Sequence, residues 1–219
     1  LTAEDAGYWG SLPNIQVIPN PLPFTSEEVS DCTSKRVLAA GRYDFQKNFS
    51  LLLRIWSKIA PSYPDWKLEI IGDGALRPAL EEEVVQLGLS SSVELSRPTQ
   101  EMQAVYLHSS IYAMTSRYEG LPMVLIEAQQ MGLPIVSFAC PCGPRDVIHE
   151  GEDGFLIPLG EEDAFVRALR QLMDSEAERQ RMGRAARLSS ARYDVDTIMA
   201  HWIQLFDTLS VTTSSTPVS

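Results

Sequence analysis

The segment EGLPMVLIEAQQMG, residues 119–132, decides the expected fold. An apolar run with helical spacing follows Pro122, and the segment ends in a glycine, which suits the C′ position after a helix. Aliphatic runs that are typical of buried strands flank it at 111–116 (IYAMTS) and 133–138 (LPIVSF). The stretch therefore predicts a strand–helix–strand unit, with Glu127 as a carboxylate inside an otherwise apolar helix.

The same alternation continues along most of the chain. Strands are expected at 36–41, 66–72, 92–96, 111–116, 133–138 and 154–158, and helices at 48–60, 75–88, 100–108, 122–131 and 144–149. Apolar strands that alternate with helices predict a parallel sheet covered on both faces. The expected fold class is α/β, a doubly wound, Rossmann-like parallel sheet that binds its ligand at the carboxyl ends of the strands.

The two ends of the chain differ from this pattern. Three trailing helices are expected at 161–174, 176–191 and 196–208, and the last is strongly apolar on one face. The Ser/Thr-rich stretch 210–219 is expected to be disordered. Three prolines in residues 14–24 (NIQVIPNPLPF) suit an interdomain linker.

The composition is that of a globular domain with an acidic surface. Of 219 residues, 44% are hydrophobic and 21% charged, and the net charge is −11. This acidity argues against nucleic acid as a partner, so an anionic ligand needs a local cationic pocket. The three cysteines, one of them Cys32 and two in the Cys140–Cys142 loop, favour reduced thiols and a cytoplasmic location. No apolar run approaches the roughly 20 residues of a membrane span, and no signal peptide is recognisable.

The chain begins with Leu1 rather than methionine. Thr2 and Asp5 then form a pattern close to a helix capping box, with nothing before it. We therefore expect this sequence to be a piece of a longer protein.

The stretch GRYDFQKN (41–48) follows the first expected strand. It begins at Gly41, and Arg42 and Lys47 place two cations beside the start of a helix. Cations at a helix N-terminus can hold an anion. The alternative is a solvated loop whose charges face water, and the sequence alone favours neither.

The stretch IIGDG (70–74) follows the second expected strand. Gly72 and Gly74 allow a close approach of the backbone, as a ligand site or a simple turn would need. Arg77 occupies the place of the third glycine of a dinucleotide fingerprint, so that motif is not met.

In the opening segment, Pro122 is expected at the first helical position, which leaves the amides of Met123 and Val124 free to meet an anion. Glu119 would precede the helix, and Glu127 would lie roughly 8 Å further along its axis. A carboxylate among aliphatic side chains needs donors, which sugar or ribose hydroxyls could supply. The alternative for both glutamates is a structural salt bridge, for instance to Arg117 or Arg145.

No metal site is expected. Asp194 and Asp196 form a D-x-D pattern, but they follow a helical stretch rather than a buried strand, which favours helix capping. The three histidines are scattered without the spacing of a metal triad.

Together these motifs resemble the carboxy-terminal, donor-binding domain of the retaining group 1 glycosyltransferases, family 4, of the GT-B fold. The resemblance covers nearly the whole chain. Its parts occur in the family's order: GR…KN, IGDG, the E-x7-E motif in SRYEGLPMVLIEAQQMGLPIV, GP…I and DGFLIP.

The resemblance implies residue roles. Arg42 and Lys47 would bind the donor diphosphate and, with Glu119 near the donor sugar, form the catalytic group. Glu127 would accept from the ribose hydroxyls, and Arg97 would lie beside the base. Donor-binding backbone is implied at Gly41, Gly72, Gly120, Leu121, Pro122, Met123 and Val124.

The resemblance also implies a domain organisation. Residues 1–22 would be the tail of a missing N-terminal acceptor domain plus the linker, 23–192 the nucleotide-sugar-binding domain, and 193–209 a helix that crosses back towards the missing domain. The tail 210–219 would follow it.

The expected function is the donor-binding half of a retaining, metal-independent glycosyltransferase that uses a UDP-sugar and needs no cofactor. The acceptor would be a polysaccharide, lipopolysaccharide or lipid-linked sugar, with the full-length enzyme cytoplasmic or at the cytoplasmic face of the inner membrane. This chain alone is expected to bind nucleotide but not to catalyse transfer. The alternatives are a UDP-sugar epimerase of the same fold, expected to lack the E-G-L-P…E run, and a non-catalytic nucleotide-binding α/β module.

Overall fold

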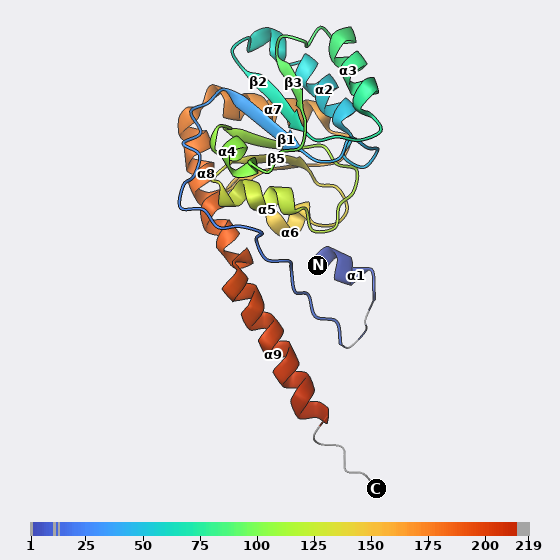
Figure 1. Ribbon diagram of the computed structural model, residues 1–219, viewed down its shortest axis with the longest axis vertical. Coiled ribbons are helices and arrows are strands. Elements are labelled where there is room, and N and C mark those ends of the chain that lie inside the picture. The colour runs from blue at the N-terminus through green and yellow to red at the C-terminus, as the bar shows by residue number, and fades with distance from the viewer. Residues whose placement is uncertain (1, 11, 13, 214–219) are drawn as a thin grey trace.

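A six-stranded parallel sheet forms the centre of the computed structural model, which describes residues 2–10, 12 and 14–213 (Figure 1). The strands run in the order β3-β2-β1-β4-β5-β6. Their bounds are β1 Arg36–Ala40, β2 Lys67–Ile71, β3 Val93–Ser96, β4 Ile111–Met114, β5 Ile135–Phe138 and β6 Gly154–Ile157. All six predicted strands are confirmed, and the strand order reverses between β1 and β4, which creates a switch point where ligands of such sheets bind.

Helices cover both faces of the sheet. On one face lie α2 (Phe49–Ser57), α3 (Arg77–Gln86) and α7 (Glu162–Asp174), and on the other α4 (Met102–Leu107), α5 (Met123–Gln130) and α6 (Pro144–Val147). The pleat of β1 shows why: Val37 and Ala39 join the first core, whereas Leu38 between them joins the second. The sheet is therefore doubly wound, as predicted.

Helix α8 (Glu176–Ser190) packs against α5 and α7. Two short 3-10 helices, η1 (Ala60–Ser62) and η2 (Ala191–Tyr193), follow α2 and α8. The predicted helices are confirmed, with boundaries that shift by a few residues.

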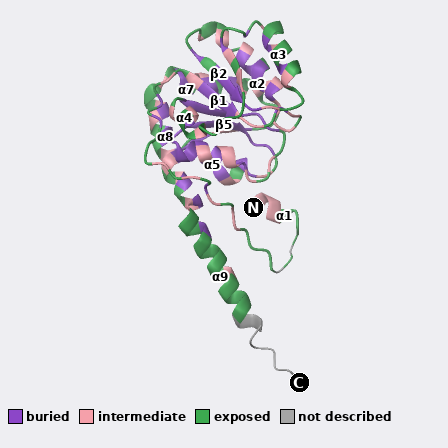
Figure 2. Ribbon diagram, in the orientation of Figure 1, coloured by how far each residue is buried: buried purple, intermediate pink, exposed green. Residues whose placement is uncertain are grey.

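Helices α1 and α9 lie on one side of the sheet domain (Figure 1). Helix α1 (Ala3–Gly7) follows the capping pattern noted at Thr2 and Asp5: the Thr2 hydroxyl accepts a hydrogen bond from the Asp5 amide at 3.0 Å. Helix α9 (Val195–Thr213) projects away from the sheet, and most of it is exposed (Figures 1 and 2).

The predicted disordered tail needs a correction, because α9 continues to Thr213 and residues 210–213 are helical. The helical pattern of 196–208 simply propagates, since extending an existing helix costs less than starting one. Residues 214–219 lie outside the described residues, as does Leu1. The predicted domain boundaries stay predictions, and no helix in the described part of the chain is long and apolar enough to cross a bilayer.

Candidate functional site

The predicted site residues gather where β1, β2 and β4 end. Gly41 follows β1 directly, and its amide donates to the Ile71 carbonyl at 2.9 Å. Gly72 follows β2, and a Cβ on it would lie 1.9 Å from the Gly41 carbonyl oxygen. Only glycine allows these two strand ends to approach so closely, so Gly72 shapes the floor of the site.

Lys47 and Glu119 form an ion pair at the edge of this floor. Lys47 Nζ lies 2.7 Å from Glu119 Oε1, and the Glu119 side chain is only 7% exposed. Gln46 Nε2 donates to the second carboxylate oxygen of Glu119 at 3.3 Å. The Lys47 ammonium and the Gln46 side-chain amide therefore each contact one oxygen of the Glu119 carboxylate.

The alternative partners considered for Glu119 are used elsewhere. Arg117 donates to Asn48 Oδ1 at 3.0 Å, and Arg145 lies 3.5 Å from Glu4. The suggested salt bridges to these two arginines are therefore wrong. Lys47 neutralises Glu119 instead, which joins two of the three predicted catalytic residues directly.

Arg42 is held much more loosely than Lys47. Its side chain is 78% exposed, and its Nε lies 3.4 Å from Asp44 Oδ2. Because an exposed ion pair of this kind contributes little free energy, the guanidinium can turn towards a ligand at small cost. Arg42 also lines the pocket described below.

The start of α5 differs by one residue from the prediction. Pro122 precedes the first helical residue, Met123, instead of occupying that position. Its ψ of 89° is not helical, although its carbonyl accepts from the Leu125 amide at 2.9 Å. The amides of Met123 and Val124 still belong to the first helical turn, which has no i−4 carbonyl for them in a regular helix. That these amides face an anion stays a prediction.

The loop Cys140–Pro144 braces the segment that carries Glu119. Gly143 has a φ of +97°, and a Cβ on it would lie 2.3 Å from both the Gly120 carbonyl oxygen and Pro122 Cδ. The Pro141 carbonyl accepts from the Glu119 amide at 3.0 Å. Sequence reasoning did not identify this support, since no pattern in CPCGP indicates which loop it meets.

The same loop contacts the N-terminal segment. The Cys142 amide donates to Glu4 Oε2 at 3.0 Å, and the Ala3 amide donates to Asp146 Oδ1 at 3.0 Å. The segment around α1 is therefore connected to Glu119 through the Glu4 carboxylate, the Cys140–Pro144 loop and the hydrogen bond from the Glu119 amide to the Pro141 carbonyl. Burial raises the pKa of the Cys140 thiol to about 12, so that thiol stays protonated at neutral pH.

A pocket of about 320 Å³ opens beside this floor. The ends of β1 and β2, the loop after β3 and the exposed face of α5 line it. Its members are Ala40, Gly41, Arg42, Ile71, Gly72, Asp73, Pro98, Thr99, Met102, Val124 and Glu127. The pocket joins five of the predicted donor-binding residues, Gly41, Arg42, Gly72, Val124 and Glu127, with the loop expected to lie beside a base.

Glu127 lies on the pocket wall, where a tyrosine hydroxyl donates a hydrogen bond to its carboxylate. The Tyr106 hydroxyl donates to Glu127 Oε2 at 2.9 Å, and no ion pair with Glu127 occurs among the described residues. Burial raises the pKa of Glu127 above its ordinary value of 4.5, against the opposing effect of this hydrogen bond.

Seven predicted residues do not line this pocket: Lys47, Arg97, Glu119, Gly120, Leu121, Pro122 and Met123. Arg97 and Leu121 are directed elsewhere. Arg97 is exposed and pairs with Asp73 at 2.9 Å, whereas its neighbours Pro98 and Thr99 line the wall. Leu121 instead lines a different hollow, beside Thr2. The Leu121 side chain points that way because its segment packs against the N-terminal residues.

Two tyrosines under the pocket were not identified from the sequence. Tyr106 on α4 and Tyr112 on β4 are fully buried, with ring centroids 6.1 Å apart. The Tyr112 hydroxyl accepts from the Ala40 amide at 3.1 Å. Aromatic residues on apolar faces usually fill a core, so the sequence carries no signal that these hydroxyls support a site.

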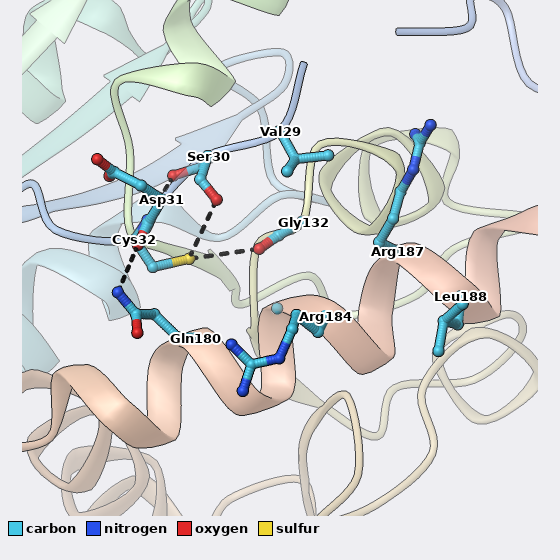
Figure 3. A pocket seen from close by; sticks show the side chains of 10 residues that line it. Val29, Ser30, Asp31, Cys32, Gly132, Gln180, Arg184, Arg187 and Leu188 are labelled. Carbon is cyan, nitrogen blue, oxygen red and sulfur yellow. Dashed lines mark hydrogen bonds between the residues drawn. The ribbon is translucent and has the colours of Figure 1, made fainter. Parts of the chain in front are cut away.

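A larger hollow of about 580 Å³ lies on another part of the molecule (Figure 3). Val29, Cys32, Gly132, Arg184 and Leu188 are among its lining residues, and no predicted site residue is. Burial raises the pKa of the Cys32 thiol to about 11, and this thiol donates to the Gly132 carbonyl at 3.3 Å. We assign the candidate site to the smaller pocket, because it brings Arg42, the carboxylate of Glu127 and the start of α5 together beside the Lys47–Glu119 pair.

The described residues contain no group of three or more His, Cys, Asp or Glu side chains that could hold a metal ion.

Together, the strand order and the convergence at the switch point define a Rossmann-like α/β domain. The model of the family described as glycosyl transferases group 1 matches residues 25–189. This chain belongs to that family. It corresponds to the C-terminal domain of a GT-B enzyme, as the resemblance implied.

Individual relatives agree with the assignment. The chain is 38% identical over 212 residues to the amylovoran biosynthesis glycosyltransferase AmsD of Erwinia amylovora, a match that covers 92% of this chain and 59% of that protein. The chain thus spans little more than half the length of this relative.

Solved structures show the same fold. The S. aureus protein TarM, crystallised with UDP among its ligands, superimposes with a TM-score of 0.83 at 23% identity, over 92% of this chain and 41% of TarM. The C-terminal domain of the group 1 family protein LpcC from Francisella tularensis gives a TM-score of 0.67 at 17% identity, over 80% of this chain and 97% of that domain.

Proposed function

We propose that this chain is the donor-binding domain of a retaining, metal-independent glycosyltransferase and that it binds a UDP-sugar. The observation that carries the proposal is the convergence of Lys47, Arg42, the start of α5 and Glu127 at one edge of the sheet. This arrangement offers cations to a diphosphate and a carboxylate to a ribose.

The proposed chemistry places negative charge on the departing diphosphate. Lys47 and Arg42 would stabilise this charge together with the amides of Met123 and Val124 at the helix start. Because the Lys47 side chain passes close to Gly41, where a Cβ would lie 2.9 Å from Lys47 Cε, and pairs with Glu119, it would link the phosphate with the sugar that Glu119 faces. Residues of the chain itself supply these charges, so we propose no metal and no cofactor.

The remaining part of the ligand would occupy the 320 Å³ pocket. The ribose would meet Glu127, and the base would lie against Pro98 and Thr99 with Met102 beside it. Arg97 would contact the base or a ribose oxygen only if its pair with Asp73 opened.

The relatives support this proposal in part. UDP is bound in the TarM structure, and the name of AmsD refers to amylovoran biosynthesis. We propose transfer to a polysaccharide, lipopolysaccharide or lipid-linked acceptor held by a further, N-terminal domain, at the cytoplasmic face of the inner membrane. This chain alone would then bind donor without transferring sugar.

Isothermal titration calorimetry of the 219-residue chain with UDP and with GDP tests the proposal. We expect UDP to bind with the higher affinity and AMP, which carries one phosphate, to bind far more weakly. Absence of binding by both diphosphates at millimolar concentration would refute the nucleotide site. Preference for GDP would retain the site and reject the proposed base.

A further inference from the structure

The carboxylate of Glu127 has an unusual environment. It is half-buried on α5, lines the proposed nucleoside pocket, and accepts a hydrogen bond from Tyr106 at 2.9 Å. Among the described residues, the ion pairs do not include Glu127. By contrast, Lys47 neutralises Glu119, eight positions earlier in the chain.

Tyr106 is well placed to fix the position of this carboxylate. Its side chain is fully buried on α4, with the ring against Tyr112 at 6.1 Å and an angle of 37°. A buried tyrosine ring has few rotamers, so the packed ring determines where the hydroxyl lies. The hydroxyl meets Oε2 of Glu127, which leaves Oε1 available to accept from a ligand.

A purely structural role would not require a carboxylate here. A buried tyrosine hydroxyl needs an acceptor, but the carbonyl oxygen of a glutamine would satisfy it equally well. Gln129 and Gln130 occur on the same helix. The glutamate adds a desolvation cost, visible in its raised pKa, that a neutral acceptor would avoid.

The desolvation cost of the Glu127 carboxylate is offset if two further hydrogen-bond donors approach it. The vicinal hydroxyls of a ribose are such donors, and hydrogen bonds to an ionised acceptor are stronger than those to a neutral one. A carboxylate that is free to rotate would lose part of this gain in ordering itself. A carboxylate already held in position would keep the whole gain in binding free energy.

We propose that Tyr106 is a positioning residue: its hydroxyl orients Glu127 for the two ribose hydroxyls, so that this pair selects ribonucleotides over their deoxy counterparts. The inference rests on the proposed nucleotide-binding function. Tyr106 itself touches no ligand and acts through Glu127.

Calorimetric titration of the wild-type chain and the Tyr106→Phe variant with UDP and 2′,3′-dideoxy-UDP tests this inference. The wild type should prefer UDP. Tyr106→Phe should weaken UDP binding by about 3- to 10-fold, the range expected for one hydrogen bond, and change dideoxy-UDP binding less than twofold.

Tyr112→Phe is the matched control, because it removes a buried hydroxyl from the same ring pair without touching Glu127. Any effect of this variant should be equal for the two ligands. Thermal unfolding should show that both variants remain folded, as the isosteric change predicts.

The double variant Tyr106→Phe/Glu127→Ala gives an independent readout. If Tyr106 acts through Glu127, its change should add nothing to the UDP affinity already lost in Glu127→Ala. Additive losses, or equal losses for both ligands in Tyr106→Phe, would overturn the positioning role while UDP binding itself remained. Failure of the wild type to bind any nucleoside diphosphate would overturn the proposed function and this inference together.

Discussion

Glu119 and Glu127 belong to one motif, but the structure treats the two carboxylates differently. Glu119 lies on a loop, where Lys47 and Gln46 hold its two oxygens. Glu127 lies on α5, where only the neutral hydroxyl of Tyr106 reaches it within the described chain. A lysine cancels most of the desolvation cost at the first site, whereas the second site keeps that cost until a ligand supplies donors.

The comparison teaches that the two ends of the proposed ligand are recognised by different means. At the Glu119 end, opposite charges are already paired, and the phosphate must share Lys47 with the carboxylate. At the Glu127 end, a carboxylate that has no ion-pair partner among the described residues can accept hydrogen bonds from hydroxyl groups of the ligand. The first end should therefore respond to changes of charge and loop packing, and the second to changes of a single hydrogen bond.

The largest effect is expected for Lys47→Ala. It removes a charge-assisted contact to phosphate and leaves Glu119 next to the anion without its cation, so UDP affinity should fall about 100-fold. Calorimetry measures this loss of UDP affinity directly.

Lys58→Ala is the control, because Lys58 is an exposed cation on the same βα unit that pairs with Asp163. Lys58→Ala should bind UDP within twofold of the wild type. If both variants lost the same UDP affinity, the change of net charge would explain the effect of Lys47→Ala without a direct contact to phosphate.

Gly143→Ala should damage the Glu119 end through packing. Its Cβ would meet the Gly120 carbonyl and Pro122 at 2.3 Å, with φ at +97°. We expect a loss of about 2 kcal/mol or more, which lowers Tm by roughly 4 °C or more in a domain of this size.

Gly151→Ala provides the comparison for that variant. Gly151 also has a positive φ, +75°, but nothing lies within 4 Å of a Cβ there. It should cost only about 1 kcal/mol, the strain of the left-handed conformation alone. Equal losses of Tm at both positions would mean that the CPCGP loop does not brace the Glu119 segment as tightly as the geometry indicates.

Glu127→Gln should raise the stability of the fold at pH 7 while it weakens UDP binding. Because the folded protein holds the Glu127 proton more tightly than the unfolded chain, the contribution of this group to stability is greatest below pH 4.5 and falls as the pH rises through its raised pKa. The neutral variant should therefore have a Tm up to about 3 °C higher at pH 7, with the difference vanishing near pH 4.

The same variant should bind UDP about tenfold more weakly, since a neutral acceptor forms weaker bonds with hydroxyls. Thermal unfolding and calorimetry across pH measure the two effects. A variant less stable than the wild type at pH 7 would contradict the desolvated state of Glu127.

The smallest effect is expected for Glu4→Ala, which removes the acceptor of the Cys142 amide and the partner of Arg145. UDP affinity should fall less than threefold, with an unchanged ratio of UDP to 2′,3′-dideoxy-UDP binding, because these partly exposed contacts lie away from the pocket and each contributes about 1 kcal/mol or less. Glu27→Ala is the matched control, an exposed residue with the same change of charge. A change of the ratio would connect α1 to the Glu127 end instead of the Glu119 end.

Much of the fold was predictable because its signals are local. Apolar strands of four or five residues alternate with amphipathic helices, and Gly132 after α5 has a φ of +74°, as a helix C′ residue requires. The boundary of α9 was harder to predict, since nothing in SVTT ends the helix where the apolar pattern stops.

The charged residues near the candidate site were predictable, but its buried tyrosines and its contacts were not. The motifs placed Arg42, Lys47, Glu119 and Glu127 at strand ends that a doubly wound sheet brings together. They did not indicate that Lys47 would pair with Glu119, because those residues are 72 positions apart and separate loops carry them. Pro122 also lies one residue before the position assigned to it.

The sequence by itself determined the alternation of strands and helices, the family and the residues that carry charge at the strand ends, because these depend on spacing along the chain. Only the tertiary structure decided which side chains meet. The packing of CPCGP against EGLP, the exposure of Arg42 and the hydroxyl of Tyr106 on Glu127 all result from contacts between elements far apart in sequence. Such contacts depend on how the layers fit together, and no local pattern encodes that fit.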